Sequence, residues 1–136
     1  MILCDAGPLV ALVDRRDGLH SQSVATLATL PPIPLRTTWH CLTEAMHLLG
    51  RGTGFAGQDA LWSYIADGLV TLYAQPDDEW PHMRALMRQY SDTPMDLADA
   101  SLVLAAERLG ERRIFTFDHH FRAYRVGKGR LQMIPQ

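Results

Sequence analysis

Short apolar runs alternate along the chain with longer segments in which apolar residues recur at helical spacing. Runs typical of strands occupy residues 2–4, 35–37, 69–73, 113–117 and 131–134. Helical periodicity, broken by Gly and Pro, covers residues 9–13, 19–30, 39–49, 58–66, 79–90 and 96–109. Strands that alternate with helices predict an α/β domain with a parallel sheet covered by helices.

Local signals set the expected ends of several helices. The glycines at 50, 52, 54 and 57 are expected to end the helix that runs from about Trp39 to Leu49. Asp96 is expected to cap the helix that runs to Leu109, with Gly110 as its stop. In the segment 19–30, Val24, Leu27 and Ala28 share one side.

Composition is that of an ordinary globular chain, because 47% of the 136 residues are hydrophobic and 21% are charged. We expect residues 1–136 to form one domain. No apolar run reaches the length of a membrane span, and the N-terminus lacks the basic start of a signal peptide. Two isolated cysteines, Cys4 and Cys41, fit a cytoplasmic protein better than a disulfide framework.

Charge is distributed unevenly along the chain. The formal net charge of −2 argues against a general nucleic-acid binder. Residues 101–136, however, carry seven Lys and Arg against three acids, so this segment is basic. Its cations are suited to an RNA backbone or to a protein partner, and the sequence favours neither. They are Arg108, Arg112, Arg113, Arg122, Arg125, Lys128 and Arg130.

Two acids follow predicted strands directly. Asp5 comes after the first strand and Asp118 after the fourth. In open α/β sheets, ligands bind beyond the carboxyl ends of the strands, so these two carboxylates are candidates to converge. The alternative is that each acid simply caps the helix that follows it.

Two further acids occupy the borders of apolar helix faces. Asp99 precedes an apolar stripe formed by Leu102, Val103 and Ala106, although it also completes a capping-box variant with Asp96. Glu44 lies at the edge of the apolar face of its helix, where a surface ion pair with a histidine is the plain alternative. Four clustered carboxylates would repel one another and would need a divalent cation, Mg²⁺ or Mn²⁺ rather than zinc.

The order of these motifs resembles the PIN-domain ribonucleases, in particular the VapC-type toxins of toxin–antitoxin pairs. The resemblance covers almost the whole chain. Its motifs are Ile2-Leu3-Cys4-Asp5, Thr43-Glu44-Ala45 with Leu48-Leu49, Met95-Asp96-Leu97-Ala98-Asp99-Ala100, and Thr116-Phe117-Asp118 with Phe121.

This resemblance implies a three-layer α/β/α fold with a parallel sheet of four to five strands, and an acidic pocket that binds Mg²⁺, with Mn²⁺ as a substitute. It implies endonucleolytic cleavage of RNA that leaves a 5′-phosphate and a 3′-hydroxyl. The catalytic quartet would be Asp5, Glu44, Asp99 and Asp118, with Asp5, Asp99 and Asp118 as metal ligands. Thr116 would orient Asp118, and Asp96 would assist the site or act only as a cap.

The same resemblance implies a small antitoxin that neutralises the enzyme and a homodimer held by apolar residues of the early helices. One alternative is a PIN-domain nuclease with a role in RNA processing or on structured nucleic acid. Another is a phosphoacceptor domain that uses Asp5, but Ala6-Gly7 stands where its second aspartate is expected. Two other motifs have little support in the sequence. They are a zinc site of Cys41, His40 and His47 and a phosphoesterase signature at Asp118-His119-His120. Three tryptophans, Trp39, Trp62 and Trp80, are expected in the core or at an interface.

Overall fold

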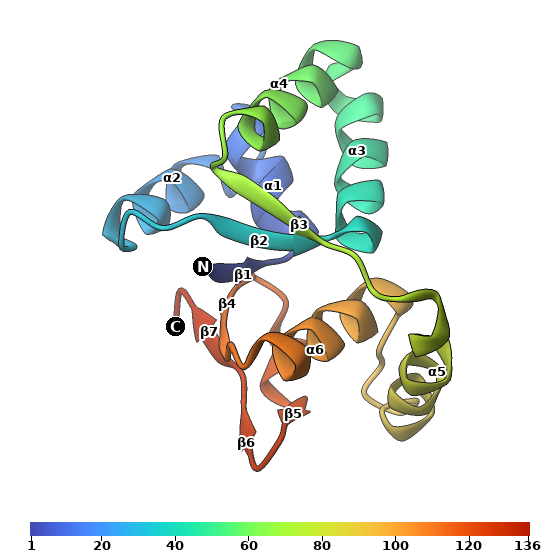
Figure 1. Ribbon diagram of the computed structural model, residues 1–136. Coiled ribbons are helices and arrows are strands. Elements are labelled where there is room, and N and C mark those ends of the chain that lie inside the picture. The colour runs from blue at the N-terminus through green and yellow to red at the C-terminus, as the bar shows by residue number, and fades with distance from the viewer.

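A five-stranded sheet lies at the centre of the computed structural model, which describes residues 1–136 (Figure 1). Its strands stand in the order β3-β2-β1-β4-β7, and every neighbouring pair is parallel. Their bounds are β1 Ile2–Cys4, β2 Leu35–Thr38, β3 Val70–Tyr73, β4 Arg113–Phe115 and β7 Gln132–Ile134. These strands confirm the predicted α/β class and the parallel sheet.

Helices cover both faces of this sheet. One face carries α1 (Ala6–Val13), α2 (His20–Thr29), α3 (Trp39–Thr53) and α4 (Phe55–Ala66), and the other carries α5 (Trp80–Gln89) and α6 (Leu97–Leu109), as Figure 1 shows. The arrangement is therefore the expected three-layer α/β/α fold. None of the helices combines the length and the apolar character that a membrane crossing needs.

The direction of strand addition reverses beside β1. From β1 the chain builds β2 and β3 outward on one side, and then α5 and α6 return it to β4 on the other side of β1. Cys4 pairs with Phe115, and the backbone N–H of Asp5 donates to the carbonyl of Phe115 at 3.0 Å. The residues that follow β1 and β4 therefore meet at the switch point, where α/β sheets bind their ligands.

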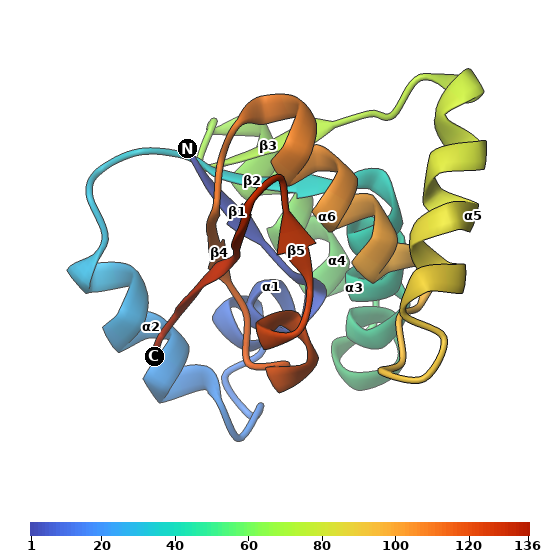
Figure 2. The ribbon, with the colours of Figure 1, turned by 90° about the horizontal axis from the view of Figure 1, so that it is seen from below.

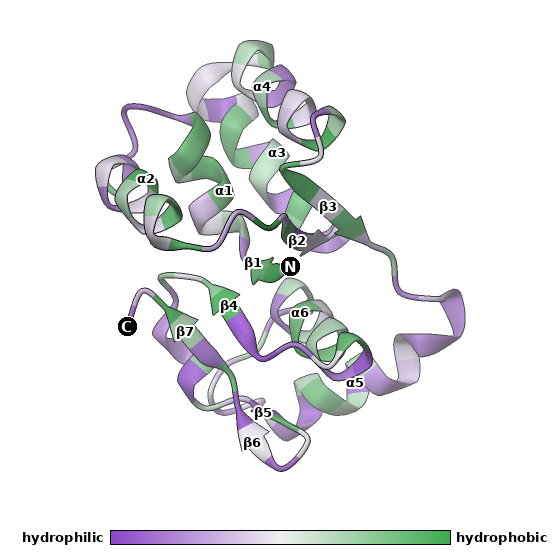
Figure 3. Cartoon of the chain, turned by 60° about the vertical axis from the view of Figure 1, so that its left-hand side comes forward, coloured by the Kyte–Doolittle hydropathy of each residue, from purple (hydrophilic) through white to green (hydrophobic).

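One continuous hydrophobic core extends over both faces of the sheet and includes the buried residues of α6. Residues Asp99 to Ala106 of α6 are all buried, because the helix is enclosed between the sheet, α5 and the short ribbon of β5 (Arg125–Val126) and β6 (Gly129–Arg130) (Figure 2). In Figure 3 the central strand β1 is green, as hydrophobic residues are, between the two helical layers. A buried α6 fixes its own N-terminus rigidly at the edge of the sheet where β1 and β4 end.

One helix is longer than the sequence predicts. Gly50 and Gly52 do not end α3, which runs to Thr53 and stops at Gly54, whose φ is 71°. At Gly50 a side chain would collide with Gln58, whose Nε2 donates to the carbonyl of Met46 at 2.9 Å. The glycine is needed for this contact between α3 and α4, which offsets the roughly 1 kcal/mol that Gly costs inside a helix.

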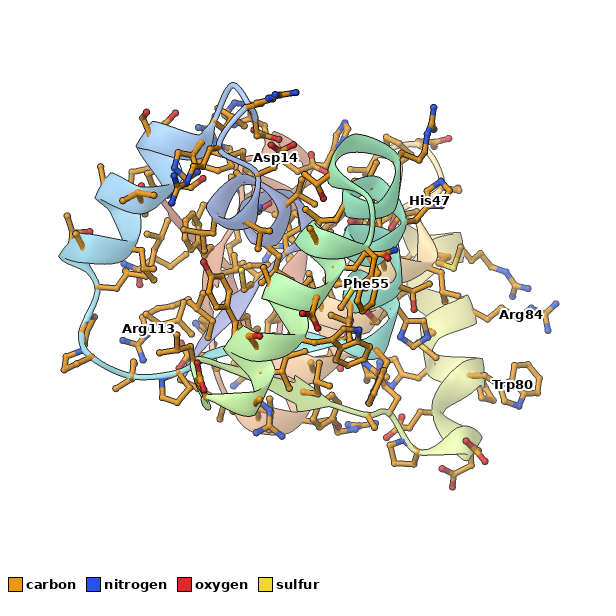
Figure 4. The ribbon with its side chains drawn as sticks, turned by 90° about the horizontal axis from the view of Figure 1, so that it is seen from above. Asp14, His47, Phe55, Trp80, Arg84 and Arg113 are labelled. Carbon is orange, nitrogen blue, oxygen red and sulfur yellow. The ribbon has the colours of Figure 1, made fainter.

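The exposure of several apolar side chains was also not predicted. The inner side of α2 presents Ser23 and Thr26, whereas Val24 and Leu27 remain 46% and 41% exposed. All three tryptophans are exposed, so none lies in the core, and their place at an interface stays a prediction; Trp80 is 59% exposed and projects outward from α5 (Figure 4). Helical spacing identifies one apolar side of a helix but not whether the fold covers it.

The β5–β6 ribbon is a further element that the sequence analysis missed. Its strands pair in antiparallel fashion around Gly127-Lys128, and Gly127 has a φ of 60°. Each strand has only two residues, too few for an alternating pattern to stand out. The ribbon converts the basic C-terminal segment into an ordered surface that packs on α6.

Candidate active site

Asp5 lies at the carboxyl end of β1 with both carboxylate oxygens engaged. Its Oδ1 accepts from the N–H of Ala6 at 2.8 Å, as a cap of α1 would, and its Oδ2 accepts from the hydroxyl of Thr116 at 2.9 Å. The side chain is buried, and this burial raises the pKa of Asp5 against the lowering effect of both hydrogen bonds. The charges of Asp118 and Asp96 raise the same pKa further.

Thr116 joins the two strand ends. It directly follows β4 and is 1% exposed, and its hydroxyl both donates to Asp5 and accepts from the N–H of Asp118 at 3.0 Å. We expected Thr116 to orient the carboxylate of Asp118. The structure corrects this expectation: Thr116 contacts the carboxylate of Asp5 and only the backbone of Asp118, because β4 ends at Phe115 and the chain turns before Asp118.

Asp118 is the more solvated of the two strand-end acids. Its Oδ1 caps the short helix η2 (His119–Arg122) by accepting from the N–H of His120 at 2.9 Å. The ring Nδ1 of His120 lies 2.9 Å from the same oxygen, and 37% of the Asp118 side chain is exposed. His119 and His120 are exposed, while Phe121 is fully buried. Asp118 therefore has one oxygen committed to the cap and one without a protein partner.

Asp96 and Asp99 form the predicted capping box at the start of α6. Asp96 Oδ1 accepts from the N–H of Asp99 at 2.8 Å, and Asp99 Oδ2 accepts from the N–H of Asp96 at 3.2 Å. Asp99 is 8% exposed, and burial raises its pKa from 3.8 to about 7. Its hydrogen bond from Asp96 opposes that rise, while the charges of Asp96, Asp5 and Asp118 add to it.

Glu44 approaches the same region from α3. The start of α3 is tied to α6 because the hydroxyls of Thr38 and Ser101 lie 2.6 Å apart and the Cys41 thiol faces the carbonyl of Ala98 at 3.8 Å. Glu44 is exposed and forms no ion pair with a histidine. Partial burial is the main cause that raises the pKa of Glu44, and the charges of Asp5, Asp96 and Asp118 raise it further. Glu44 thus stands at the solvent side of the acidic cluster.

The acidic cluster, defined here as Asp5, Glu44, Asp96, Asp99 and Asp118, contains no Lys or Arg partner. No ion pair of the chain reaches it except that between His120 and Asp118. Burial raises the pKa values of Asp5, Glu44 and Asp99, and the charges of neighbouring acids raise them further, as expected of carboxylates that lack a neutralising cation. In chemical kind, these oxygen donors fit Mg²⁺ or Mn²⁺.

The side chains as they lie do not form a coordination group. No three His, Cys, Asp or Glu side chains of the chain stand together in an arrangement that would hold a metal ion. Asp5 Oδ2 faces Thr116, Asp99 Oδ2 faces the backbone of Asp96, and Asp118 Oδ1 faces η2. Cation binding at this cluster therefore requires at least some of the five acids to move closer together.

Tyr124 is a neighbour of the acidic cluster that the sequence analysis missed. Its hydroxyl lies 3.3 Å from Asp99 Oδ2, and its ring is fully buried. Burial raises the pKa of Tyr124, and the charge of Asp99 raises it further. The segment around Tyr124 was interpreted by its charges alone. The spacing of Phe121 and Tyr124, three residues apart between exposed arginines, is the signal that would have indicated an inward side.

Other candidate groups lie apart from this chemistry. Cys41 is fully buried, and burial raises its pKa to about 12, which disfavours the thiolate that a zinc site needs. Cys4 is likewise a buried free thiol. The largest cavity, about 560 Å³, lies at the opposite, amino-terminal edge of β2 and β3, where Leu35 and Val70 begin those strands. None of its lining residues is charged.

Two cations of the basic segment are already paired. Arg108 donates to Glu79 through Nε and Nη2 at 2.9 and 3.0 Å, and Arg113 donates to Glu111 from Nε at 2.9 Å. Arg113 also lies at the opposite side of the molecule from Arg84 and Trp80 in Figure 4. Five other cations are exposed and form no ion pair: Arg112, Arg122, Arg125, Lys128 and Arg130. Within this basic segment, the unpaired cations thus lie on η2, on the β5–β6 ribbon and between α6 and β4.

Comparison with known proteins supports the interpretation of the motifs. No family model matches the chain. The chain is 26% identical to "Ribonuclease VapC26" of Mycobacterium tuberculosis strain H37Rv, over 98% of this chain and 100% of that protein. The crystal structure of Mycobacterium tuberculosis VapC20, a sarcin–ricin loop cleaving toxin, superposes with a TM-score of 0.83 and 22% identity, over 96% of this chain and 99% of that one. Both findings confirm the resemblance predicted from the sequence: the chain has the PIN-domain fold of the VapC-type proteins.

Proposed function

We propose that this chain is a divalent-metal-dependent endoribonuclease whose site is the acidic cluster. One observation carries the proposal. Asp5 and Asp118 are joined through Thr116 at the switch point of the sheet, the charges of both raise the pKa of Asp99 at the start of α6, and no Lys or Arg is paired with any of the three. If these aspartates had only a structural role, we would expect a Lys or Arg side chain to be paired with them.

Each acid has a distinct task in this proposal. Asp5, Asp99 and Asp118 would hold the cation through carboxylate lone pairs that accept no hydrogen bond from the protein. A Mg²⁺ or Mn²⁺ ion bound there would lower the pKa of a water molecule and offset the charge that develops on the phosphate oxygens. Glu44, which is exposed at the solvent side of the cluster, would orient the attacking water or accept its proton.

Two further residues support these acids. Thr116 holds Asp5 by donating to Oδ2, so the plane of that carboxylate is set before any ligand arrives. Asp96 fixes the start of α6 by accepting from the N–H of Asp99, which places Asp99 at the cluster. Asp96 also adds negative charge, since it raises the pKa values of Asp5, Glu44 and Asp99.

RNA binding would use the cations that remain free. Arg122, Arg125, Lys128 and Arg130 extend from the residues just after Asp118 onto the β5–β6 ribbon, and Arg112 adds to them. A polyanion contacting this ribbon would reach the acidic cluster from a positively charged side. Arg108 and Arg113 would contribute little, because each is held by a glutamate.

A toxin role, with a small antitoxin as inhibitor, is favoured over an RNA-processing role because both similar proteins carry VapC names and one is a toxin. An antitoxin tail that places an arginine against the unpaired acids would neutralise the cluster directly. Homodimerisation would cover exposed apolar residues of the early helices, such as Val24, Leu27 and Leu48. A cytoplasmic location belongs to the same proposal.

The test compares cleavage of RNA by the wild-type protein and by Asp5→Asn and Asp99→Asn, with Mg²⁺ and with EDTA. Asp59→Asn is the matched control, because Asp59 is exposed on α4 and its side chain has no hydrogen bond or ion pair. We expect cleavage that EDTA abolishes, that both site variants lose and that the control retains, with unchanged circular dichroism. Full activity in both site variants would refute the assignment.

A further inference from the structure

Tyr124 reaches the first turn of α6 from a distant part of the chain. Its hydroxyl donates to the carbonyl of Pro94 at 2.5 Å and lies 3.3 Å from Oδ2 of Asp99. A phenol has one proton, so the carbonyl of Pro94 and the carboxylate of Asp99 share it, and the shorter contact, with Pro94, is the stronger. Tyr124 is fully buried, so water does not compete for either contact.

The ring of Tyr124 is held firmly by two other aromatic rings. Tyr90 packs edge-to-face against it with centroids 5.0 Å apart, and Phe121 does the same at 5.1 Å. The hydroxyl of Tyr90 in turn accepts from the N–H of Arg125 at 2.9 Å, which fixes the backbone next to Tyr124. The position of the Tyr124 hydroxyl is therefore set by the packing and not by Asp99.

The contact distinguishes the two oxygens of Asp99. Oδ2 is approached from two sides, by the N–H of Asp96 at 3.2 Å and by the Tyr124 hydroxyl. Oδ1 takes part in no hydrogen bond of the structure. The side chain is thereby turned so that its unoccupied oxygen is the one left for a ligand.

We propose that Tyr124 is a positioning residue for Asp99: its hydroxyl holds Oδ2 so that Oδ1 is presented to the cation. This proposal rests on the proposed function in one respect, namely that Asp99 is a metal ligand. It assigns a role in the metal site to the C-terminal segment beyond Asp118.

The test measures Mn²⁺ binding by electron paramagnetic resonance in Tyr124→Phe, with Tyr90→Phe as the matched control. Both variants remove one hydroxyl from the same edge-to-face pair of rings, but only Tyr124 contacts Asp99. We expect Tyr124→Phe to weaken Mn²⁺ binding about tenfold, the lower end of the effect of residues that orient metal ligands. In cleavage assays the Mg²⁺ requirement should rise by the same factor while the KM for RNA stays unchanged. Tyr90→Phe should leave both values at the wild-type level.

The outcomes separate this inference from the proposed function. Equal weakening in the two variants, or none in Tyr124→Phe, would overturn the role of Tyr124 and leave the nuclease assignment intact. If the wild-type protein binds no Mn²⁺, or Asp99→Asn retains it, the proposed function fails. The crystal structure of metal-free Tyr124→Phe then decides the positioning role alone. A rotated Asp99 carboxylate supports that role, and an unmoved one refutes it.

Discussion

The substitution Asp99→Asn should stabilise the metal-free protein at the same time as it abolishes activity. Asp99 is 8% exposed and carries a pKa raised from 3.8 to about 7, so its ionised form is disfavoured in the folded state. Asparagine has nearly the same shape and carries no charge. Its side-chain oxygen can still accept from the N–H of Asp96 and from Tyr124, so the capping box is not lost.

The magnitude follows from linkage between protonation and folding. A carboxyl whose pKa is higher in the folded state binds its proton more tightly there, so stability falls as the pH rises from about 4 to about 7. A rise of about three units corresponds to roughly 4 kcal/mol at 1.36 kcal/mol per unit. Part of the carboxyl is solvated, and Asp96, Asp5 and Asp118 share the repulsion. We therefore expect Asn to recover about half of this value, roughly 2 kcal/mol, above pH 7.

The assay is urea unfolding with EDTA at pH 5 and at pH 8, for the wild-type protein and for Asp99→Asn. At pH 8 the variant should be more stable by roughly 2 kcal/mol, which is about 4–8 °C in Tm for a chain of this size. At pH 5 the gain should be smaller, because the folded wild-type protein binds a proton at Asp99 that the unfolded chain, with a carboxyl pKa near 3.8, mostly lacks; it should vanish only below about pH 4. The control Asp59→Asn should change neither value. A variant that is no more stable than wild type at pH 8, or equally stabilised at both pH values, would refute the reasoning.

Three further predictions follow from the same contacts. Thr116→Val should lower the cleavage rate at saturating RNA by about 10–100-fold without raising KM, because Asp5 loses its orienting donor; an unchanged rate would contradict this. Arg125→Gln should weaken binding of a cleavage-resistant 2′-O-methyl RNA and lower the salt slope of log K by about 1, whereas Arg113→Gln, whose arginine is already paired, should not. Adding Mg²⁺ should raise the Tm of the wild-type protein more at pH 8 than at pH 5, because the ion binds Asp99 only when its carboxyl is ionised; equal shifts would count against a carboxylate site.

The sequence predicted the convergence of the acids because parallel strands end at one edge of a sheet. Asp5 follows β1 directly, Asp118 comes three residues after the end of β4, and Asp96 and Asp99 show their capping pattern within four consecutive residues. The partner of Thr116 could not be predicted in the same way. It depends on the register that sets Cys4 beside Phe115 and on the exact residue at which β4 ends. A shift of one residue would have turned Thr116 to the other face of the sheet.

The contacts that distant segments make with one another could not be predicted from the sequence, for a related reason. Periodicity reports which residues of one helix share a side, but it does not report what covers that side. Leu27 lies on the apolar side of α2 and remains exposed, whereas Tyr124, in a segment read only by its charges, is fully buried. Gly50 persists inside α3 because Gln58 from the next helix occupies the space beside it. Each of these outcomes is decided by contacts between elements that only the folded chain brings together.

Helix capping and metal binding were opposed explanations for these aspartates, yet the structure makes them compatible. Asp5 and Asp118 each use one oxygen as a cap, and the capping box occupies Oδ2 of Asp99, so every one of the three has further acceptor capacity. A cap alone needs neither burial of the acid nor the absence of a cation, since Ser or Thr would cap without adding charge. The chain instead gathers five acids whose repulsion raises several of their pKa values. Buried carboxylates that cluster without a neutralising partner are typical of functional sites. Here the partner that these acids lack is a positive charge that the chain itself does not supply.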